Sequence, residues 1–293
     1  WLAEHRMAFA EKILVVATFV LSLFFNALAA CGYLSAQSLG AVSAAHPTYL
    51  TPDMMTFLVW VVTYSLEGVL VVMQCSPSDK SEKLLQQRCL LTSLSVRWRL
   101  VIAFLLNSLW LPLYANLFWG KAMLVIIVYL AFLLSIYVDM NTKTTSSFAE
   151  WTIYASGIAC NISWVLVAAA ANKFTLAGYY GWTDDYGVSG TPQAAVIVIG
   201  ILTEPVAVMV AICRSDFAWC LVTMWAFAGV YRQQTFSDAG FPVQAMSRAL
   251  ALCAASSAVV VGVATATGMF LIPYNGSFQS KSLSDGQLPL LNE

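Results

Sequence analysis

Charged residues are scarce in this sequence. Only 10% of its 293 residues are Asp, Glu, Lys or Arg, whereas 60% are hydrophobic and the mean hydropathy is +0.75. So little polar surface excludes a soluble globular protein. The net charge of -1 and the pI near 6.1 leave no basic patch beyond one short loop, which excludes nucleic acid as a partner. The sequence therefore predicts an all-α integral membrane protein.

Residues that carry catalysis or bind metals are also scarce. The two His residues, His5 and His46, lie far apart and outside the apolar runs, so they predict neither a zinc pair nor a Ser-His-Asp set. The chain has no glycine-rich phosphate loop. Its seven Cys residues include no CxxC pair, and we interpret them as small core residues. We therefore expect neither an enzyme nor a covalently bound cofactor.

Long apolar runs are what the sequence has in abundance. A helix of about 20 apolar residues crosses a bilayer. Eight runs of roughly that length follow one another, at residues 13–36, 51–74, 100–118, 122–138, 151–171, 194–213, 217–231 and 249–272. They predict a polytopic bundle of about eight transmembrane helices. Residues 1–12 are then an N-terminal lead-in, and residues 273–293 are a polar tail.

The distribution of Lys and Arg predicts an orientation. One side holds the N-terminus, the loops after the second, fourth and sixth runs, and the C-terminus, and it carries all but four of the 14 basic residues. The four on the opposite side are Lys121, Lys173, Arg232 and Arg248. Because basic residues concentrate on the inner side of a membrane, we expect both termini there.

Three of the runs carry aromatic and polar side chains at helical spacing. These stripes are Phe57, Trp60, Tyr64 and Glu67 in the second run, Asn107, Trp110, Tyr114 and Phe118 in the third, and Trp151, Tyr154, Ile158 and Asn161 in the fifth. Two interpretations stay open. Either the aromatic residues pack the helices together, with each polar group adding about 0.6 kcal/mol, or they line a mostly apolar pocket for a flat hydrophobic ligand.

Two carboxylates, Glu67 and Glu204, lie inside the apolar runs without a basic residue in the same run. Acids at such positions are functional candidates. One hypothesis is a proton-coupled transporter in which Glu204-Pro205 forms a broken-helix gate. The other, which we favour, is a structural hydrogen bond from the acid to a backbone carbonyl that Pro205 leaves free.

Several segments resemble a known family. TFLVWVVTY (56–64), LLNSLWLPLY (105–114) and WTIYASGIACNISW (151–164) are similar to the TspO-type family of tryptophan-rich sensory and translocator proteins. AWCLVTMWAFAGV (218–230) resembles a late helix of its longer branch. The resemblance implies a TspO-like membrane domain over residues 13–240 with a five-helix core, and an additional helix at 241–272. Members bind porphyrins, sterols and synthetic aromatic ligands in an aromatic-lined pocket, often as dimers, in bacterial or organellar membranes.

Carried onto this chain, the resemblance implies that Trp60, Asn107, Trp110, Trp151 and Asn161 contact the ligand. The stripes add Phe57, Tyr64, Tyr114 and Tyr154 to this predicted pocket. Two departures stand out: Leu58-Val59 occupies the place of the family's Pro, and Trp151 and Asn161 lie two residues further apart than in the family. The longer spacing turns Asn161 toward an adjacent face.

The expected ligand is a noncovalent porphyrin, pigment, sterol or lipid. The expected partners are membrane lipid, a small hydrophobic ligand, and a second copy of the chain or a larger membrane complex, in a plastid or mitochondrial membrane. The alternative function is a structural accessory subunit of an organellar photosynthetic or respiratory complex, with the same interior packed shut or filled by lipid or pigment. A proton-coupled transporter is the third candidate.

Overall fold

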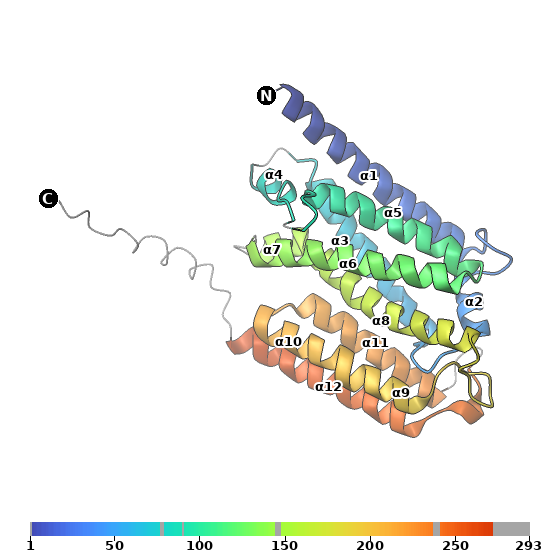
Figure 1. Cartoon of the computed structure of the whole chain (residues 1–293). Helices are drawn as coiled ribbons and strands as arrows, with labels where there is room; N and C mark the ends of the chain where they lie inside the picture. Colours follow the sequence, from blue (N-terminus) through green and yellow to red (C-terminus); the bar gives the residue numbers. More distant parts are fainter. Residues whose placement is uncertain (1, 77–78, 90, 144–147, 237–240, 272–293) are drawn as a thin grey trace.

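The computed structural model is a bundle of long helices, and the residues that it describes form no named strand (Figure 1). It describes the whole chain except residues 1, 77–78, 90, 144–147, 237–240 and 272–293. The predicted polar tail at 273–293 therefore lies outside the described residues.

Five long helices form a closed ring. They are α1 (Leu2–Ala30), α3 (Val59–Met73), α5 (Val96–Ala115), α6 (Trp119–Lys143) and α8 (Ser156–Tyr179). α1 packs against α5, α5 against α6, α6 against α8 and α8 against α3, and α3 returns to α1. This ring encloses the space in which the predicted aromatic stripes can meet.

The remaining long helices form a second layer against α8. α9 (Pro192–Ile197), the π-helix η2 (Val198–Thr203) and α10 (Glu204–Arg214) make one continuous rod, followed by α11 (Phe217–Phe236) and α12 (Arg248–Leu271). α10, α11 and α12 pack on one another, and α11 contacts α8 (Figure 1). A π-helix just before Pro205 is expected, because proline has no N–H to continue the regular ladder.

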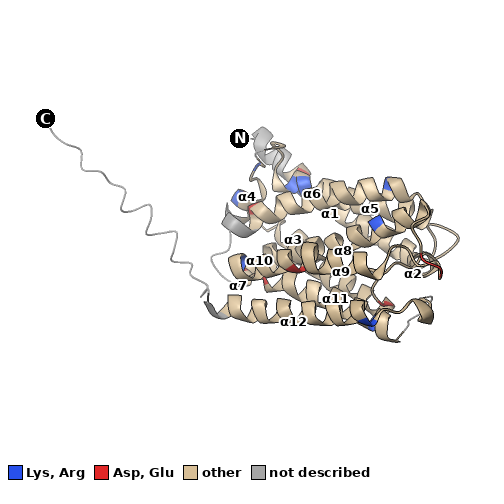
Figure 2. Cartoon of the chain, turned by 60° about the horizontal axis from the view of Figure 1, so that its bottom comes forward, with Lys and Arg blue, Asp and Glu red and all other residues tan. Residues whose placement is uncertain are grey.

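Seven helical stretches of the described chain are long and apolar enough to cross a membrane: Phe9–Ala30, Met54–Met73, Val96–Ala115, Trp119–Met140, Ser156–Tyr179, Pro192–Arg214 and Arg248–Met269. The seventh predicted run is the 20-residue helix α11, which is not among them. Its last turns are polar, with Arg232, Gln233 and Gln234. The predicted class, an all-α polytopic membrane bundle, is confirmed, and charged residues are sparse along the helices (Figure 2).

Two predicted boundaries differ from the structure. α1 ends at Ala30 rather than near residue 36, because Gly32 adopts a left-handed φ of 78° and the Tyr33 N–H bonds back to the Leu28 carbonyl. The fifth run is not one helix. α7 (Phe148–Tyr154) ends before Ala155, and α8 then continues to Tyr179, beyond the predicted end at residue 171. At Ala155 the backbone stays in the α region, and the Ala155 N–H still bonds to the Trp151 carbonyl at 2.9 Å, so α7 leads into α8 through a local irregularity.

The two ends of the bundle are closed differently. At the end that holds the start of α1, α4 (Asp79–Leu85) is fastened by ion pairs, in which Glu82 binds Lys12 at 2.5 Å and Arg97 at 2.8 Å. At the opposite end, α2 (Leu39–Ala45) and η1 (Met54–Leu58) lie beside the loop that follows α8. There the Ser189 N–H donates to the Pro47 carbonyl at 2.9 Å, and the Tyr49 hydroxyl donates to Asp184.

The cysteines follow the prediction only in part. Cys160 and Cys220 are buried in the core, whereas Cys31, Cys75 and Cys213 are exposed. The interpretation of all seven as core residues is therefore wrong for these three. Cys31 and Cys75 lie just beyond the ends of α1 and α3, where packing is loose.

Candidate functional site

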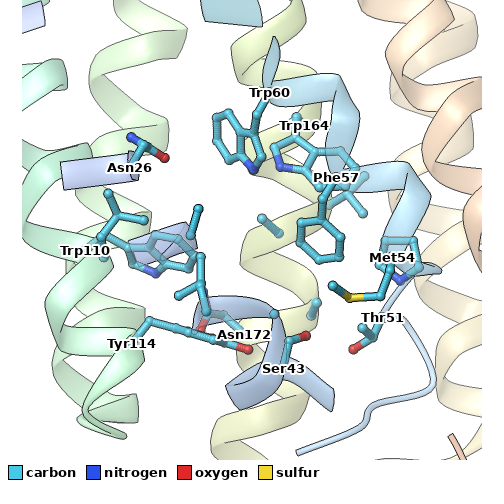
Figure 3. Close-up of a pocket in the computed structure, with 18 of the residues that line it drawn as sticks. Asn26, Ser43, Thr51, Met54, Phe57, Trp60, Trp110, Tyr114, Trp164 and Asn172 are labelled. Atoms are coloured by element: carbon cyan, nitrogen blue, oxygen red, sulfur yellow. The ribbon is translucent and has the colours of Figure 1, made fainter. Parts of the chain in front are cut away.

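A cavity of about 440 Å³ lies inside the five-helix ring, near the end closed by α2. Trp110 and Tyr114 of α5 form one wall, and Phe57, Trp60 and Trp164 lie across from them (Figure 3). The rest of the lining comes from α1, α2, η1 and the residues before it, α3, α5 and α8: Asn26, Ala30, Ser38, Leu39, Gly40, Ser43, Thr51, Pro52, Met54, Val61, Tyr64, Leu111, Val167, Ala168, Ala171 and Asn172.

The aromatic walls are held by ring-to-ring contacts. Trp60 and Tyr64, one helical turn apart, stack at 5.1 Å with 12° between their planes. Trp164 meets Trp60 edge-to-face at 6.1 Å and Phe57 at 5.6 Å. On the other side Trp110 and Tyr114 lie 5.0 Å apart. Such pairs each add about 0.5–1.5 kcal/mol beyond simple burial, so the walls are firmly positioned before any ligand arrives.

The structure brings five of the nine predicted ligand residues to this cavity: Phe57, Trp60, Tyr64, Trp110 and Tyr114. Trp60 and Tyr64 share one face of α3, and Trp110 and Tyr114 share one face of α5, as their spacing predicts; Phe57 lies in the 3-10 helix η1, which leads directly into α3. The other four predicted residues, Asn107, Asn161, Trp151 and Tyr154, do not line it.

Asn107 lies directly behind the wall. Its side-chain amide donates to the Tyr64 hydroxyl at 3.0 Å and to the Tyr129 hydroxyl at 3.3 Å, and it accepts a bond from Asn26 at 3.3 Å. Asn26 and Tyr64 in turn line the cavity. Asn107 therefore orients polar groups of the wall rather than lining the cavity itself.

Asn161 extends this polar chain to Glu67. Its side-chain amide donates to the Glu67 carboxyl at 2.6 Å and to the Tyr129 hydroxyl at 2.7 Å. Glu67 is fully buried and, within the described chain, has no ion-pair partner and a second carboxyl oxygen without a hydrogen bond. A continuous series of side chains thus joins the cavity wall to a buried acid through Asn107, Tyr129 and Asn161.

Gly157 sets the distance between α3 and α8 at this point. A Cβ atom at Gly157 would lie 2.7 Å from the backbone nitrogen of Glu67, so only glycine permits this approach. The close crossing is what brings Asn161, one turn further along α8, within reach of Glu67.

Trp151 and Tyr154 belong to α7, more than two helical turns before Trp164, and at about 100° per residue Trp151 falls on nearly the opposite side of the helix from Trp164. Trp151 packs against Phe217 of α11 at 4.4 Å and borders a second cavity of about 450 Å³ between α3, α7, α8 and α11. The expectation that these two residues join Trp60 and Trp110 in one pocket does not match the geometry.

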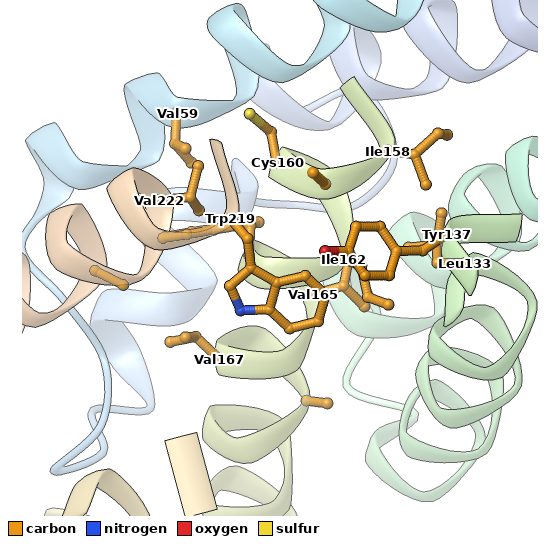
Figure 4. Packing of buried hydrophobic residues seen from close by; sticks show 14 of the residues in the cluster. Val59, Leu133, Tyr137, Ile158, Cys160, Ile162, Val165, Val167, Trp219 and Val222 are labelled. Atoms are coloured by element: carbon orange, nitrogen blue, oxygen red, sulfur yellow. The ribbon is translucent and has the colours of Figure 1, made fainter. Parts of the chain in front are cut away.

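Around Ile162 and Val165, side chains of α6 and α11 pack closely against α8. Trp219 of α11 lies beside Tyr137 of α6, with ring centres 5.1 Å apart, over the aliphatic residues Ile162 and Val165 (Figure 4). The Tyr137 hydroxyl donates to Asp216 at 2.8 Å, and Asp216 accepts from the Trp219 backbone N–H at 3.2 Å. Desolvation by burial raises the pKa of Asp216, which lies between α10 and α11. Aromatic residues on this face serve packing.

Sequence reasoning missed Trp164 and Asn172. Trp164 replaces Trp151 as the tryptophan that the fifth run contributes to the cavity, and its spacing of three from Asn161 was a usable signal. Asn172 falls in a predicted loop, but α8 includes it. It is 3% exposed, it lines the cavity, and its side-chain oxygen has no hydrogen-bond partner among the described residues.

Glu204 lies outside this cavity, in the second layer of helices. The Ser257 hydroxyl of α12 donates to its carboxylate. In the described structure its partner is thus a side chain, whereas we expected a backbone carbonyl. Glu204 and Glu67 belong to separate hydrogen-bonded groups.

No set of three or more His, Cys, Asp or Glu side chains that could hold a metal ion occurs in the described part of the chain. The cavity is therefore built for contact with apolar and aromatic surface, with amides and hydroxyls as its polar groups.

Comparison with known proteins identifies a family. Residues 12–266 match the family model described as TSPO-like protein. No curated protein and no solved structure matches the chain significantly.

Proposed function

Because the chain belongs to the TSPO-like protein family, we propose that its central cavity binds a flat hydrophobic ligand inside the membrane, such as a tetrapyrrole or a sterol. The observation that carries this proposal is the convergence of two aromatic walls, from α5 and from α3 with α8, on one cavity of about 440 Å³. Ligand sites typically measure about 300–1,000 Å³, with mostly apolar walls and a few polar groups. The protein acts by binding or carrying the ligand, without chemical conversion.

The aromatic walls suit a flat ligand in particular. Trp60 and Tyr64 present a pair of nearly parallel rings, and Trp110 lies across the cavity from them. A planar ring system between these walls gains stacking contacts on both of its faces. The Asn26–Asn107–Tyr64 group supplies polar atoms at one side of the cavity that can orient the ligand.

Tryptophan fluorescence tests this proposal. Protoporphyrin or heme titrated into the purified protein should quench tryptophan emission with saturation, and Trp60→Ala and Trp110→Ala should each weaken binding by about tenfold or more. Trp98→Ala is the matched control, because Trp98 lies on α5 but does not line the cavity. Absence of saturable quenching in the wild type, or equal losses in Trp98→Ala, would contradict the proposal.

The scaffold function has one supporting observation. Tyr179, Tyr180, Trp182 and Tyr186 are exposed by 68, 78, 42 and 53% at the end of the bundle near α2. Exposed aromatic residues are enriched at protein interfaces. Stoichiometric subunits co-purifying in mild detergent, and lost when these four residues are replaced by Ser, would favour a structural subunit of an organellar complex.

A further inference from the structure

The polar groups of the described cavity lining belong to uncharged side chains. None of its described lining residues is Asp, Glu, Lys, Arg or His. Its hydrogen-bonding groups are the amides of Asn26 and Asn172, several hydroxyls, and the indoles. An ionised group that entered this cavity would lose its hydration without meeting a counter-ion, and that is costly.

Two acids lie near the cavity, and the cation that follows the lining residue Asn172 in the chain does not line it. Glu67 lies behind the wall at the end of the Asn107–Tyr129–Asn161 chain. Asp53, next to the lining residues Pro52 and Met54, is 2% exposed and binds Arg232 at 2.5 Å. Lys173 follows Asn172 in the chain, but it is exposed and does not line the cavity. No Lys, Arg or His is among the described residues that line the cavity, so an anionic ligand would find no counter-ion within it.

The cavity opens between α1 and α3. Its exposed lining residues are Ala30 on α1, Val61 on α3, and Met54, which begins the same spanning stretch as α3. The two helices contact each other farther toward the other end, where Phe19 packs on Gly68 and the Gln74 amide donates to the Lys12 carbonyl at 3.1 Å. The opening therefore has an apolar rim between two membrane-spanning stretches, at the end of the bundle where the first stretch ends at Ala30 and the second begins at Met54.

We propose that the central cavity selects an uncharged, lipid-soluble ring compound, which enters from the bilayer between α1 and α3, and discriminates against ligands that carry ionised carboxylates. This inference rests on the proposed function and narrows its ligand class. It separates a neutral ring ligand from a dicarboxylic tetrapyrrole, two classes that the aromatic walls alone do not distinguish.

The test compares two ligands with the same ring system, protoporphyrin IX and its dimethyl ester. The full-length protein is placed in phosphatidylcholine nanodiscs, and quenching of tryptophan emission gives each affinity. Both affinities are expressed relative to the concentration of ligand dissolved in the lipid phase. This removes the contribution of the ester's greater solubility in lipid from the comparison. We expect the ester to bind at least about tenfold more tightly, equivalent to about 1.4 kcal/mol.

A charge placed at the rim should change this preference. Met54→Lys puts an ammonium beside the opening, at a side chain that is 42% exposed, and Met54→Gln is the uncharged control of similar length. We expect Met54→Lys to tighten binding of the diacid severalfold with little effect on the ester, and Met54→Gln to keep the wild-type preference.

The outcomes separate the two proposals. If the diacid binds the wild type as tightly as the ester, or more tightly, selection for an uncharged ligand is overturned while the binding function stands. Selection for an uncharged ligand is also overturned if Met54→Lys leaves the wild-type preference for the ester unchanged. It is overturned as well if Met54→Gln shifts this preference as much as Met54→Lys does. If neither porphyrin nor ester shows saturable quenching, the binding function itself fails.

Discussion

Replacing Asn161 tests the buried polar chain most directly. Asn161→Leu keeps a side chain of similar size but removes the hydrogen bonds to Glu67 at 2.6 Å and to Tyr129 at 2.7 Å. Tyr129 keeps its contact with Asn107 at 3.3 Å, whereas Glu67 loses its only hydrogen bond in the described structure. The variant therefore leaves a fully buried carboxyl group without a partner.

The size of the effect follows from these contacts. A hydrogen bond between membrane helices contributes about 0.6 kcal/mol on average, and leaving a buried polar group without a partner costs about 1–3 kcal/mol. We therefore expect Asn161→Leu to lower the free energy of unfolding by about 2–3 kcal/mol. Glu67→Met removes the acid, so Asn161→Leu should cost clearly less in that background, with a coupling energy of about 1–2 kcal/mol.

Equilibrium unfolding in mixed micelles, followed by circular dichroism for the wild type, both single variants and the double variant, measures this coupling. Additive losses in the double variant would refute the reasoning, because they would mean that the Asn161–Glu67 contact contributes nothing of its own. Ligand titration of the same variants then shows whether the buried chain also affects the cavity.

Two further predictions concern helix packing and orientation. Gly157→Ala should lower the free energy of unfolding by about 1–3 kcal/mol, because the added Cβ would lie 2.7 Å from the Glu67 backbone. Gly120→Ala is the control, because a Cβ at Gly120 would have no neighbour within 4 Å. Equal effects of the two substitutions would contradict the close crossing of α3 and α8. If both termini face the inner side, a membrane-impermeant maleimide applied from outside should label a variant retaining only Cys31 but not one retaining only Cys75, since these exposed thiols lie at opposite ends of the bundle. The reverse pattern would invert the orientation.

The sequence alone determined the class of the protein and two sides of the cavity. Apolar runs of spanning length predict membrane helices because the bilayer requires every backbone polar group to bond within its own segment. Trp60 and Tyr64 share one face, as do Trp110 and Tyr114, because about 100° of rotation per residue is a local property of an unbroken α-helix. These residues needed no knowledge of other helices to be grouped.

Only the tertiary structure decided the third side of the cavity, which α8 forms. Trp151 lies outside the cavity, whereas Trp164, further along the same run, lies in its wall, and the continuation of α8 beyond residue 171 adds Asn172. The crossing at Gly157 then joins Asn161 to Glu67. Spacing fixes positions only within one helix, whereas the meeting of faces depends on where each helix begins and how closely two backbones approach, and these contacts arise only when the helices pack.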